Sequence, residues 1–355
     1  MMKVSLILAD GTCFEGESFG YQQPTSGELV FNTSMTGYPE LMTDPSSEGQ
    51  LLVLTYPVIG NYGVQPMVED EYGLITNAES DHIHVKGLIV SDYSEYYSHW
   101  NAKESLGDWM NREKIVGISG IDTRELSKHI RLHGCMAARV VFADMPKPAE
   151  YSYTNLISKV SCTEPITYQP GKDKTVVVLD CGIRASVLRC LLQQDVTVVR
   201  VPWNYDFTSM EYDGLFISNG PGNPSYCGET IAIIQKAMAE KADKPVLGID
   251  MGCLLLGLAA GMDTYKLKYG HHTHNQPVQL AGTERCFITA QNHNYAIREE
   301  SIVGHWKTYM KNLHDGSVEG IYHTLKPWVG TMFHSESDVI DTDVSFIYDD
   351  FISKL

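Results

Sequence analysis

The chain has 355 residues, of which 43% are hydrophobic and 20% are charged, and its formal net charge is −17 at pH 7. These values are ordinary for a globular protein, and the length favours two domains. The negative charge, without any local cluster of Lys and Arg, argues against binding to nucleic acid or to an anionic membrane, because either partner would need a basic face. No segment approaches the roughly 18 apolar residues of a membrane span.

Eight cysteines are scattered along the chain, without a CxxC pair or a zinc-like spacing. The apolar run near the N-terminus is too short for the hydrophobic region of a signal peptide and stops at Asp10. We therefore expect a cytoplasmic protein with reduced thiols and no metal ion.

Residues 1–150 show strand and helix patterns without a regular alternation. Apolar residues alternate at Val4, Leu6 and Leu8, and Asp10-Gly11 follows, which predicts a hairpin. Asp122 is a plausible cap for a later helix. The other expected elements are strands at 28–31, 51–55 and 85–90 and helices at about 106–111 and 122–130. The sequence thus predicts a mixed α+β domain.

Four prolines and little periodicity between Pro146 and Lys174 predict a linker at 151–173. Strands and helices then alternate through residues 174–355. The expected strands are 175–180, 196–201, 214–218 and 245–249, and the expected helices are about 185–193 and 229–240. This order predicts a doubly wound, mostly parallel α/β domain, with its active cleft at the carboxyl ends of the strands.

The most informative motif is the apolar strand 245–249, followed by Asp250 and the buried-helix pattern 254–260. Gly248 and Gly252 permit the cramped turn of a nucleophile elbow. A Ser or Cys at its tip would be lifted into a cleft beside the positive end of the helix. Asp250 would attack an amide poorly, because the mixed anhydride is high in energy and ammonia is a bad leaving group. We expect Asp250 to cap the helix instead, a role that contributes about 1 kcal/mol.

Three further segments carry polar groups. The glycine-rich loop 218–224 follows a buried strand and offers backbone N–H groups to a ligand, and the polar segment 291–295 comes later. Beyond it, His334 and Glu336 stand two residues apart, a spacing that suits a general base and its orienting partner.

Taken in this order, the elbow and these segments resemble class I glutamine amidotransferases and, more narrowly, the small subunit of carbamoyl-phosphate synthase. The resemblance covers essentially the whole chain. The other segments that carry it are 31–38, 43–46, 54–61, 117–124, 180–184 and 266–272.

The resemblance implies roles for the two domains. Residues 1–150 correspond to the N-terminal domain, which docks the large subunit, and residues 174–355 correspond to the amidotransferase domain. The implied partner is a large ATP-dependent subunit that makes carbamoyl phosphate and receives ammonia through a tunnel. ATP and magnesium are therefore expected on that subunit, and no cofactor is expected in this chain.

The resemblance also implies catalytic residues. His334 and Glu336 match the family's catalytic His and Glu, whereas Asp250 stands at the position of the family's Cys. Ser335 stands between His334 and Glu336, where the family has Pro. The backbone N–H groups of Gly222 and Met251 match the family's oxyanion hole.

The substrate pocket keeps some family residues and loses others. Ser46 matches a serine that contacts glutamine, and Gly220 belongs to the retained loop. Leu254 stands at the position of a Gln that contacts glutamine in the family, and Cys253 stands at that of a His. Asn294 replaces a glycine in the segment that holds the α-groups of glutamine, so a side chain occupies a place where only glycine allowed close approach.

Asn292 and Tyr295 lie in the same segment as Asn294 and are the remaining candidates for contact with substrate. The replacements together favour a non-catalytic partner subunit, or a paralogue of one, that has lost glutamine hydrolysis. Glutamine is expected as a ligand only if the pocket is still competent. An active glutaminase and a remodelled pocket for another small ligand remain alternatives.

Other interpretations of the site stay open. His334 and Glu336 could be purely structural. Cys253 could act as a displaced nucleophile, although its side chain would leave the helix on another face. Asp250 and Cys253 could join the His and the Glu in a metal site. The histidines of 271–274 lie in a segment that the family uses without metal.

Overall fold

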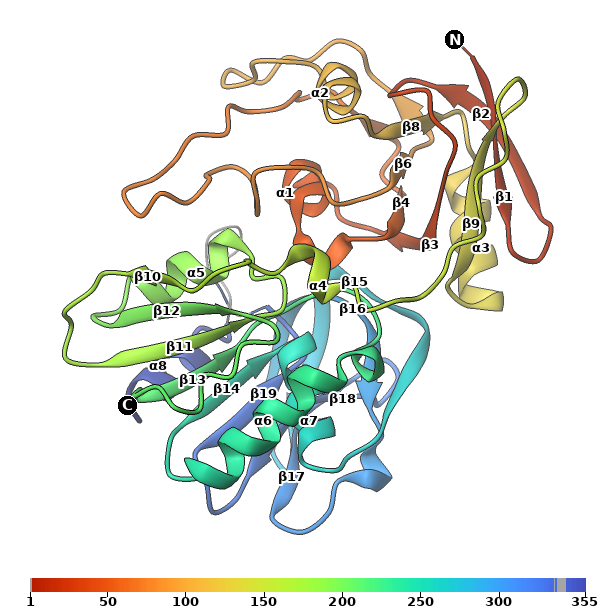
Figure 1. The fold of residues 1–355 in the computed structure, drawn as a ribbon. Helices are drawn as coiled ribbons and strands as arrows, with labels where there is room; N and C mark the ends of the chain where they lie inside the picture. The colour runs from red at the N-terminus through yellow and green to blue at the C-terminus, as the bar shows by residue number, and fades with distance from the viewer. Residues whose placement is uncertain (1, 335, 337–342) are drawn as a thin grey trace. The chain divides into compact units, whose positions relative to one another are not determined.

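The structure is a computed structural model that describes residues 2–334, 336 and 343–355 (Figure 1). The chain divides into two compact units. Unit 1 comprises Met1–Tyr153 and Lys268–His272, and unit 2 comprises Thr154–Leu267 and Thr273–Leu355. Each unit has apolar core clusters of its own. No helix in the described part of the chain is long and apolar enough to cross a membrane.

Unit 1 contains a closed barrel with the strand order β1-β2-β8-β6-β4-β3-β9. Strands β3, β4, β6 and β8 form parallel pairs, whereas the pairs that include β1, β2 or β9 are antiparallel. The elements of this unit are β1 (Lys3–Leu8), β2 (Cys13–Ser18), β3 (Thr25–Asn32), α1 (Tyr38–Thr43), η1 (Pro45–Ser47), β4 (Gln50–Leu54), β5 (Val58–Ile59), β6 (Gly87–Ile89), β7 (Asp92–Tyr93), α2 (Leu106–Arg112), β8 (Val116–Ser119), α3 (Thr123–His133) and β9 (Met136–Phe142).

The burial of the barrel strands explains their sequence patterns. In β3, Leu29 and Phe31 belong to the core cluster that includes residues of α3, whereas Val30 belongs to the cluster that includes α1 and α2. Successive side chains of a strand point to opposite faces, so β3 is buried on both sides and reads as a continuous apolar run. The expected hairpin is confirmed, because β1 pairs antiparallel with β2.

The cap expected at Asp122 is also confirmed. Its side chain accepts hydrogen bonds from the backbone N–H groups of Arg124 and Glu125, at 3.1 and 2.9 Å, at the start of α3. Local turn chemistry was sufficient to place this helix end.

Unit 2 is built on one sheet with the strand order β10-β12-β11-β13-β14-β19-β18-β16-β15-β17. Its elements are α4 (Ile157–Val160), β10 (Ile166–Tyr168), β11 (Thr175–Asp180), α5 (Ala185–Leu192), β12 (Thr197–Pro202), β13 (Gly214–Ile217), η2 (Pro224–Tyr226), α6 (Gly228–Glu240), β14 (Val246–Ile249), α7 (Met251–Ala259), β15 (Thr264–Leu280), β16 (Cys286–Ile297), η3 (Glu299–Ser301), β17 (Trp306–Asn312), β18 (Val318–His323), β19 (Trp328–Thr331) and α8 (Phe346–Ile352).

Helices cover both faces of this sheet, as expected for a doubly wound fold. In β13, Leu215 and Ile217 pack into the core cluster that contains residues of α6 and α7. Between them, Phe216 faces the other way, and its ring lies 6.0 Å from that of Tyr348 in α8. Figure 1 shows α6 and α7 on one side of the sheet and α8 on the other.

The predicted linker differs from the structure, whereas the expected doubly wound α/β fold is confirmed. The predicted linker 151–173 contains α4 and β10, and β10 pairs antiparallel with β12, so this stretch is part of unit 2 from Thr154 onward. An edge strand of three residues is too short to show a periodicity. The sheet is parallel from β12 to β19 and then continues with antiparallel pairs, among them β18–β19, β16–β18 and β15–β17.

Candidate functional site

The turn between β14 and α7 is a strained elbow with Asp250 at its tip. Asp250 has φ 51° and ψ −110°, a backbone conformation that residues other than glycine rarely adopt. Its N–H donates a hydrogen bond of 2.7 Å to the carbonyl of Thr331 in β19. A Cβ on Gly248 would lie 2.5 Å from the carbonyl oxygen of Gly252, and one on Gly252 would lie 2.0 Å from that of Ile217. The two glycines therefore permit the turn, as the sequence predicted.

The expectation that Asp250 caps α7 is wrong. Its carboxylate makes no capping hydrogen bond, although its carbonyl accepts from the N–H groups of Cys253 and Leu254 at 3.0 and 3.2 Å. Capping residues usually have an extended backbone, and the elbow conformation of Asp250 points the side chain elsewhere. Asp250 is thus 3% exposed, and its carboxylate does not cap the N-terminus of α7.

A second turn, at the carboxyl end of β11, is fixed by the fully buried Asp180. One of its oxygens accepts from the N–H groups of Gly182 and Ile183, both at 2.9 Å. The other accepts from the N–H of Cys162 at 2.6 Å and from Nε of Arg200 at 2.8 Å. Nη2 of Arg200 also lies 2.6 Å from this second oxygen, and these donors together hold the turn in place.

The glycine-rich loop after β13 is tied to that turn. The hydroxyl of Ser218 accepts from the N–H of Cys181 at 2.9 Å, and the amide of Asn219 donates to the carbonyl of Gly182 at 2.9 Å. A Cβ on Gly220 would lie 2.1 Å from the carbonyl oxygen of Cys181. Because β11, β13 and β14 are neighbouring parallel strands, the two turns and the elbow that follow them lie side by side at the edge formed by the carboxyl ends of the strands.

The same edge receives His334 and Glu336, which follow β19. The N–H of His334 donates to the carbonyl of Ala290 at 2.9 Å, and its Nδ1 lies 3.3 Å from Oε1 of Glu336. Nη1 of Arg184, from the turn after β11, donates to the same oxygen at 2.9 Å. The structure thus confirms that His334 and Glu336 are close together and adds Arg184, which was not predicted as a site residue.

The electrostatics of this group favour an ionised Glu336. Burial by itself would raise the pKa of Glu336, but the charges of His334 and Arg184 outweigh burial and lower the pKa to about 2. The pKa of His274, in β15, is also lowered, but for a histidine a lower pKa favours the neutral form. Burial and then the positive charges of Arg184 and His334 lower the pKa of His274 to about 4, so its ring is neutral at pH 7.

Cys253 does not behave as a displaced nucleophile. It is completely buried, and a Cβ on Gly330 of β19 would lie 2.8 Å from its sulfur. Burial, with the charges of Asp250 and Glu319, raises the pKa of Cys253 well above its usual value, so it remains a thiol. Leu254 is 2% exposed and belongs to the apolar core cluster.

The metal site considered from the sequence does not form among the described residues. No three of Asp250, Cys253, His334 and Glu336 bring their ligand atoms within 4.8 Å of one another. Within the described ranges, the elbow residues therefore do not form the compact donor set that a transition metal requires.

Residues 292–295 lie in the regular strand β16. The ring of His293 donates from Nδ1 to the carbonyl of Tyr295 at 2.9 Å, and Nε2 lies 3.5 Å from Oε2 of Glu319. Asn292 and Asn294 point to the opposite face of the strand from His293. Tyr295 packs into the apolar core cluster. The substrate contacts expected of Asn292, Asn294 and Tyr295 stay predictions.

The remaining predicted residues can be placed within their own elements. Ser46 lies in η1 of unit 1, where its N–H donates to Oδ1 of Asp44 at 2.8 Å. Gly222 has φ +90° and Met251 is the first residue of α7, and their roles as oxyanion donors stay predictions. Ser335 lies outside the described residues.

Comparison with known proteins gives matches over both units. Residues 6–140 match the family described as carbamoyl-phosphate synthase small chain, CPSase domain, and residues 177–354 match glutamine amidotransferase class-I. The carbamoyl phosphate synthase arginine-specific small chain of Saccharomyces cerevisiae is 42% identical over 99% of this chain and 89% of its own length.

Two much longer relatives are equally similar. The multifunctional protein pyr1-3 of Dictyostelium discoideum is 43% identical over 99% of this chain, and the carbamoyl-phosphate synthase [ammonia], mitochondrial, of Homo sapiens is 42% identical over 99% of it. The chain spans only 17% and 23% of the lengths of these two proteins.

Proposed function

This chain belongs to the carbamoyl-phosphate synthase small chain family, and we propose that it serves a carbamoyl-phosphate synthase as a partner subunit that does not hydrolyse glutamine. The partner is a large subunit, or a corresponding region of a longer chain, that binds ATP and magnesium. In this proposal the nitrogen of carbamoyl phosphate comes from free ammonia.

The observation that carries the proposal is Asp250 at the tip of the elbow. Hydrolysis of glutamine through a covalent enzyme intermediate needs a nucleophile that stays bound while ammonia leaves. A carboxylate that adds to the amide carbon is itself the better leaving group, so the adduct collapses back to glutamine. The acyl product would also be a mixed anhydride of high energy. An aspartate at this position therefore supports a scaffold that no longer performs the first chemical step.

The groups around the elbow support the same proposal. A general base beside a thiol or hydroxyl works by accepting its proton, and Asp250 offers no such proton when it is ionised. Glu336 is shared between His334 at 3.3 Å and Arg184 at 2.9 Å. We infer that these three groups now stabilise the sheet edge, because each charge has an opposite charge beside it.

One relative points to the nitrogen source. The human protein that is 42% identical over 99% of this chain carries ammonia in its name. A synthase that takes ammonia from solution does not require glutamine hydrolysis by its small chain. This supports the use of ammonia in our proposal.

The test measures both nitrogen sources with the chain and its cognate large subunit. We expect carbamoyl phosphate from bicarbonate, ATP and ammonium chloride, and no ammonia from glutamine with or without the large subunit. Glutamine turnover within about a hundredfold of an ordinary family member would overturn the loss of glutaminase activity. Size-exclusion chromatography tests assembly separately, and two separate peaks at micromolar concentrations would overturn the partner role.

A further inference from the structure

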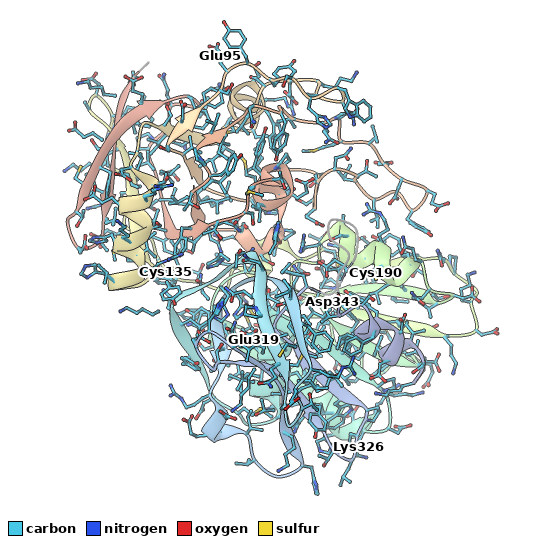
Figure 2. All side chains as sticks on the ribbon, turned by 180° about the vertical axis from the view of Figure 1, so that it is seen from behind. Glu95, Cys135, Cys190, Glu319, Lys326 and Asp343 are labelled. Carbon is cyan, nitrogen blue, oxygen red and sulfur yellow. The ribbon has the colours of Figure 1, made fainter. Side chains whose placement is uncertain are left out.

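A fully buried carboxylate, that of Glu319 in β18, lies in a polar cluster inside unit 2. Figure 2 labels Glu319 among the strands of this unit. Its Oε1 accepts a hydrogen bond of 3.2 Å from Nδ2 of Asn312 in β17, and its Oε2 lies 3.5 Å from Nε2 of His293 in β16. Burial of a charged carboxylate is costly unless a positive charge lies beside it.

The two ring nitrogens of His293 both face oxygen atoms. Nδ1 lies 2.9 Å from the carbonyl oxygen of Tyr295, which can only accept, so Nδ1 carries a proton. Nε2 lies 3.2 Å from Oε1 of Gln291. Because a neutral imidazole has a single N–H, Nε2 presents a lone pair unless the ring takes up a second proton.

The orientation of the Gln291 amide follows from its other contact. Its Nε2 donates to the hydroxyl of Thr289 at 3.0 Å, and that hydroxyl donates in turn to the carbonyl of Gln276 at 3.0 Å. Since the hydroxyl proton is already used, the amide NH₂ faces Thr289 and the amide oxygen faces His293. Gln291 and Glu319 therefore both direct oxygen atoms at Nε2 of His293.

The distances between these atoms distinguish a metal ion from a second proton on His293. A hydrogen bond between an imidazolium and a carboxylate is about 2.7–2.9 Å long, whereas Nε2 and Oε2 of Glu319 are 3.5 Å apart. Two donor atoms that each lie about 2.1 Å from a tetrahedrally coordinated ion stand about 3.4 Å apart. The separations of 3.2 and 3.5 Å thus fit coordination better than hydrogen bonding.

We propose that Nε2 of His293, Oε2 of Glu319 and Oε1 of Gln291 bind a divalent first-row metal ion, with zinc favoured by the tetrahedral spacing. Imidazole and carboxylate are common ligands of such ions. The surrounding hydrogen bonds match those of metal ligands, because Nδ1 of the histidine donates to a carbonyl and the carboxylate accepts from Asn312. The spacing was not visible in the sequence, since β16 and β18 meet only in the sheet.

The role of this ion is structural, and the inference does not depend on the proposed function. The three ligands are at most 4% exposed, so a substrate does not reach them. His293 lies between Asn292 and Asn294, which the family resemblance assigns to the glutamine pocket. An ion on His293 therefore ties the strand that carries them to β18.

The first test measures the metal content of the full chain, produced in medium with added zinc and manganese salts and then desalted. Inductively coupled plasma mass spectrometry should find about one metal ion per chain, and Glu319→Gln should reduce this content at least about tenfold. His129→Gln is the matched control. It alters a partly exposed histidine–carboxylate pair in unit 1, where Nε2 lies 2.6 Å from Oδ2 of Asp10, and should leave the metal content unchanged.

The second test measures thermal unfolding with and without the chelator dipicolinate. Glu319→Gln should fold, because its amide oxygen can accept from Asn312 while its NH₂ donates to Nε2 of His293. The chelator should lower the Tm of the unaltered chain by at least about 3 °C and leave that of Glu319→Gln unchanged. Gln291→Met, which removes a different ligand, should also lower the metal content and provides the comparison if Glu319→Gln does not fold.

Two results would overturn the metal site. An unaltered, desalted chain with less than about a tenth of an equivalent of metal would leave a protonated His293 as the link between the two oxygens. One ion per chain that persists in both Glu319→Gln and Gln291→Met would assign the metal to another part of the molecule. Neither measurement involves ammonia or glutamine, so failure of this site and failure of the proposed function are distinguishable.

Discussion

Replacement of Glu336 by glutamine should lower the stability of unit 2 in a way that depends on pH. The carboxylate lies 2.9 Å from Nη1 of Arg184 and 3.3 Å from Nδ1 of His334, and it is buried. Glu336→Gln keeps the shape of the side chain but removes its charge, so Arg184 is left largely buried without this carboxylate. The neighbouring charges that lower the pKa of Glu336 set the size of the effect.

The pKa of Glu336 falls from 4.5 to about 2 in the folded protein. A lowered pKa stabilises the folded state at pH values above the unfolded pKa, and this contribution is lost as the pH falls toward the folded pKa. The shift corresponds to about 3 kcal/mol at pH 7 and to about 2 kcal/mol at pH 3.5. The difference in unfolding free energy between the unaltered chain and Glu336→Gln should therefore shrink as the solution is acidified.

The assay is urea unfolding followed by tryptophan fluorescence at several pH values between 7 and 3.5. Trp306 and Trp328, whose rings stack at 6.0 Å in unit 2, report on this part of the chain. Glu284→Gln, at an exposed position, is the control and should change stability by less than about 0.5 kcal/mol. A destabilisation by Glu336→Gln that is the same at pH 7 and pH 3.5 would refute the reasoning.

Three further outcomes follow from the elbow and its helix. Asp250→Cys by itself should leave glutamine hydrolysis at background in an ammonia-release assay, because Leu254 and Asn294, which the family resemblance assigns to the glutamine pocket, remain; robust turnover would show that these two residues are harmless. Gly252→Ala places a Cβ 2.0 Å from a carbonyl oxygen and should destabilise the chain by about 3 kcal/mol, whereas Gly228→Ala, with nothing within 4 Å, should stay within about 0.5 kcal/mol; thermal unfolding that ranks them equally would contradict this. The buried thiol of Cys253 should resist iodoacetamide until the chain unfolds, whereas the exposed Cys286 reacts at once, and peptide mass spectrometry showing equal rates would disprove it.

Several local features could be predicted from the sequence alone. Alternation at Val4, Leu6 and Leu8 indicated the β1–β2 hairpin, and Asp122 indicated the start of α3. The elbow was predicted from an apolar strand and two glycines, and the structure shows that both glycines are needed for close packing. Periodicity and turn chemistry act within a few residues, so the sequence contains them directly.

Other features depend on segments that are distant in the chain. Asp is a residue type that commonly caps helices, yet with the elbow backbone conformation the carboxylate of Asp250 makes no capping hydrogen bond. Arg184 and Glu336 are 152 positions apart and meet only because β11 and β19 end at the same edge of the sheet. The strand β10 within a proline-rich stretch exists because β12 offers it an open edge. The sequence determined which local structures form and that aspartate occupies the elbow, whereas tertiary packing decided which charges surround that elbow, because only the folded sheet brings them together.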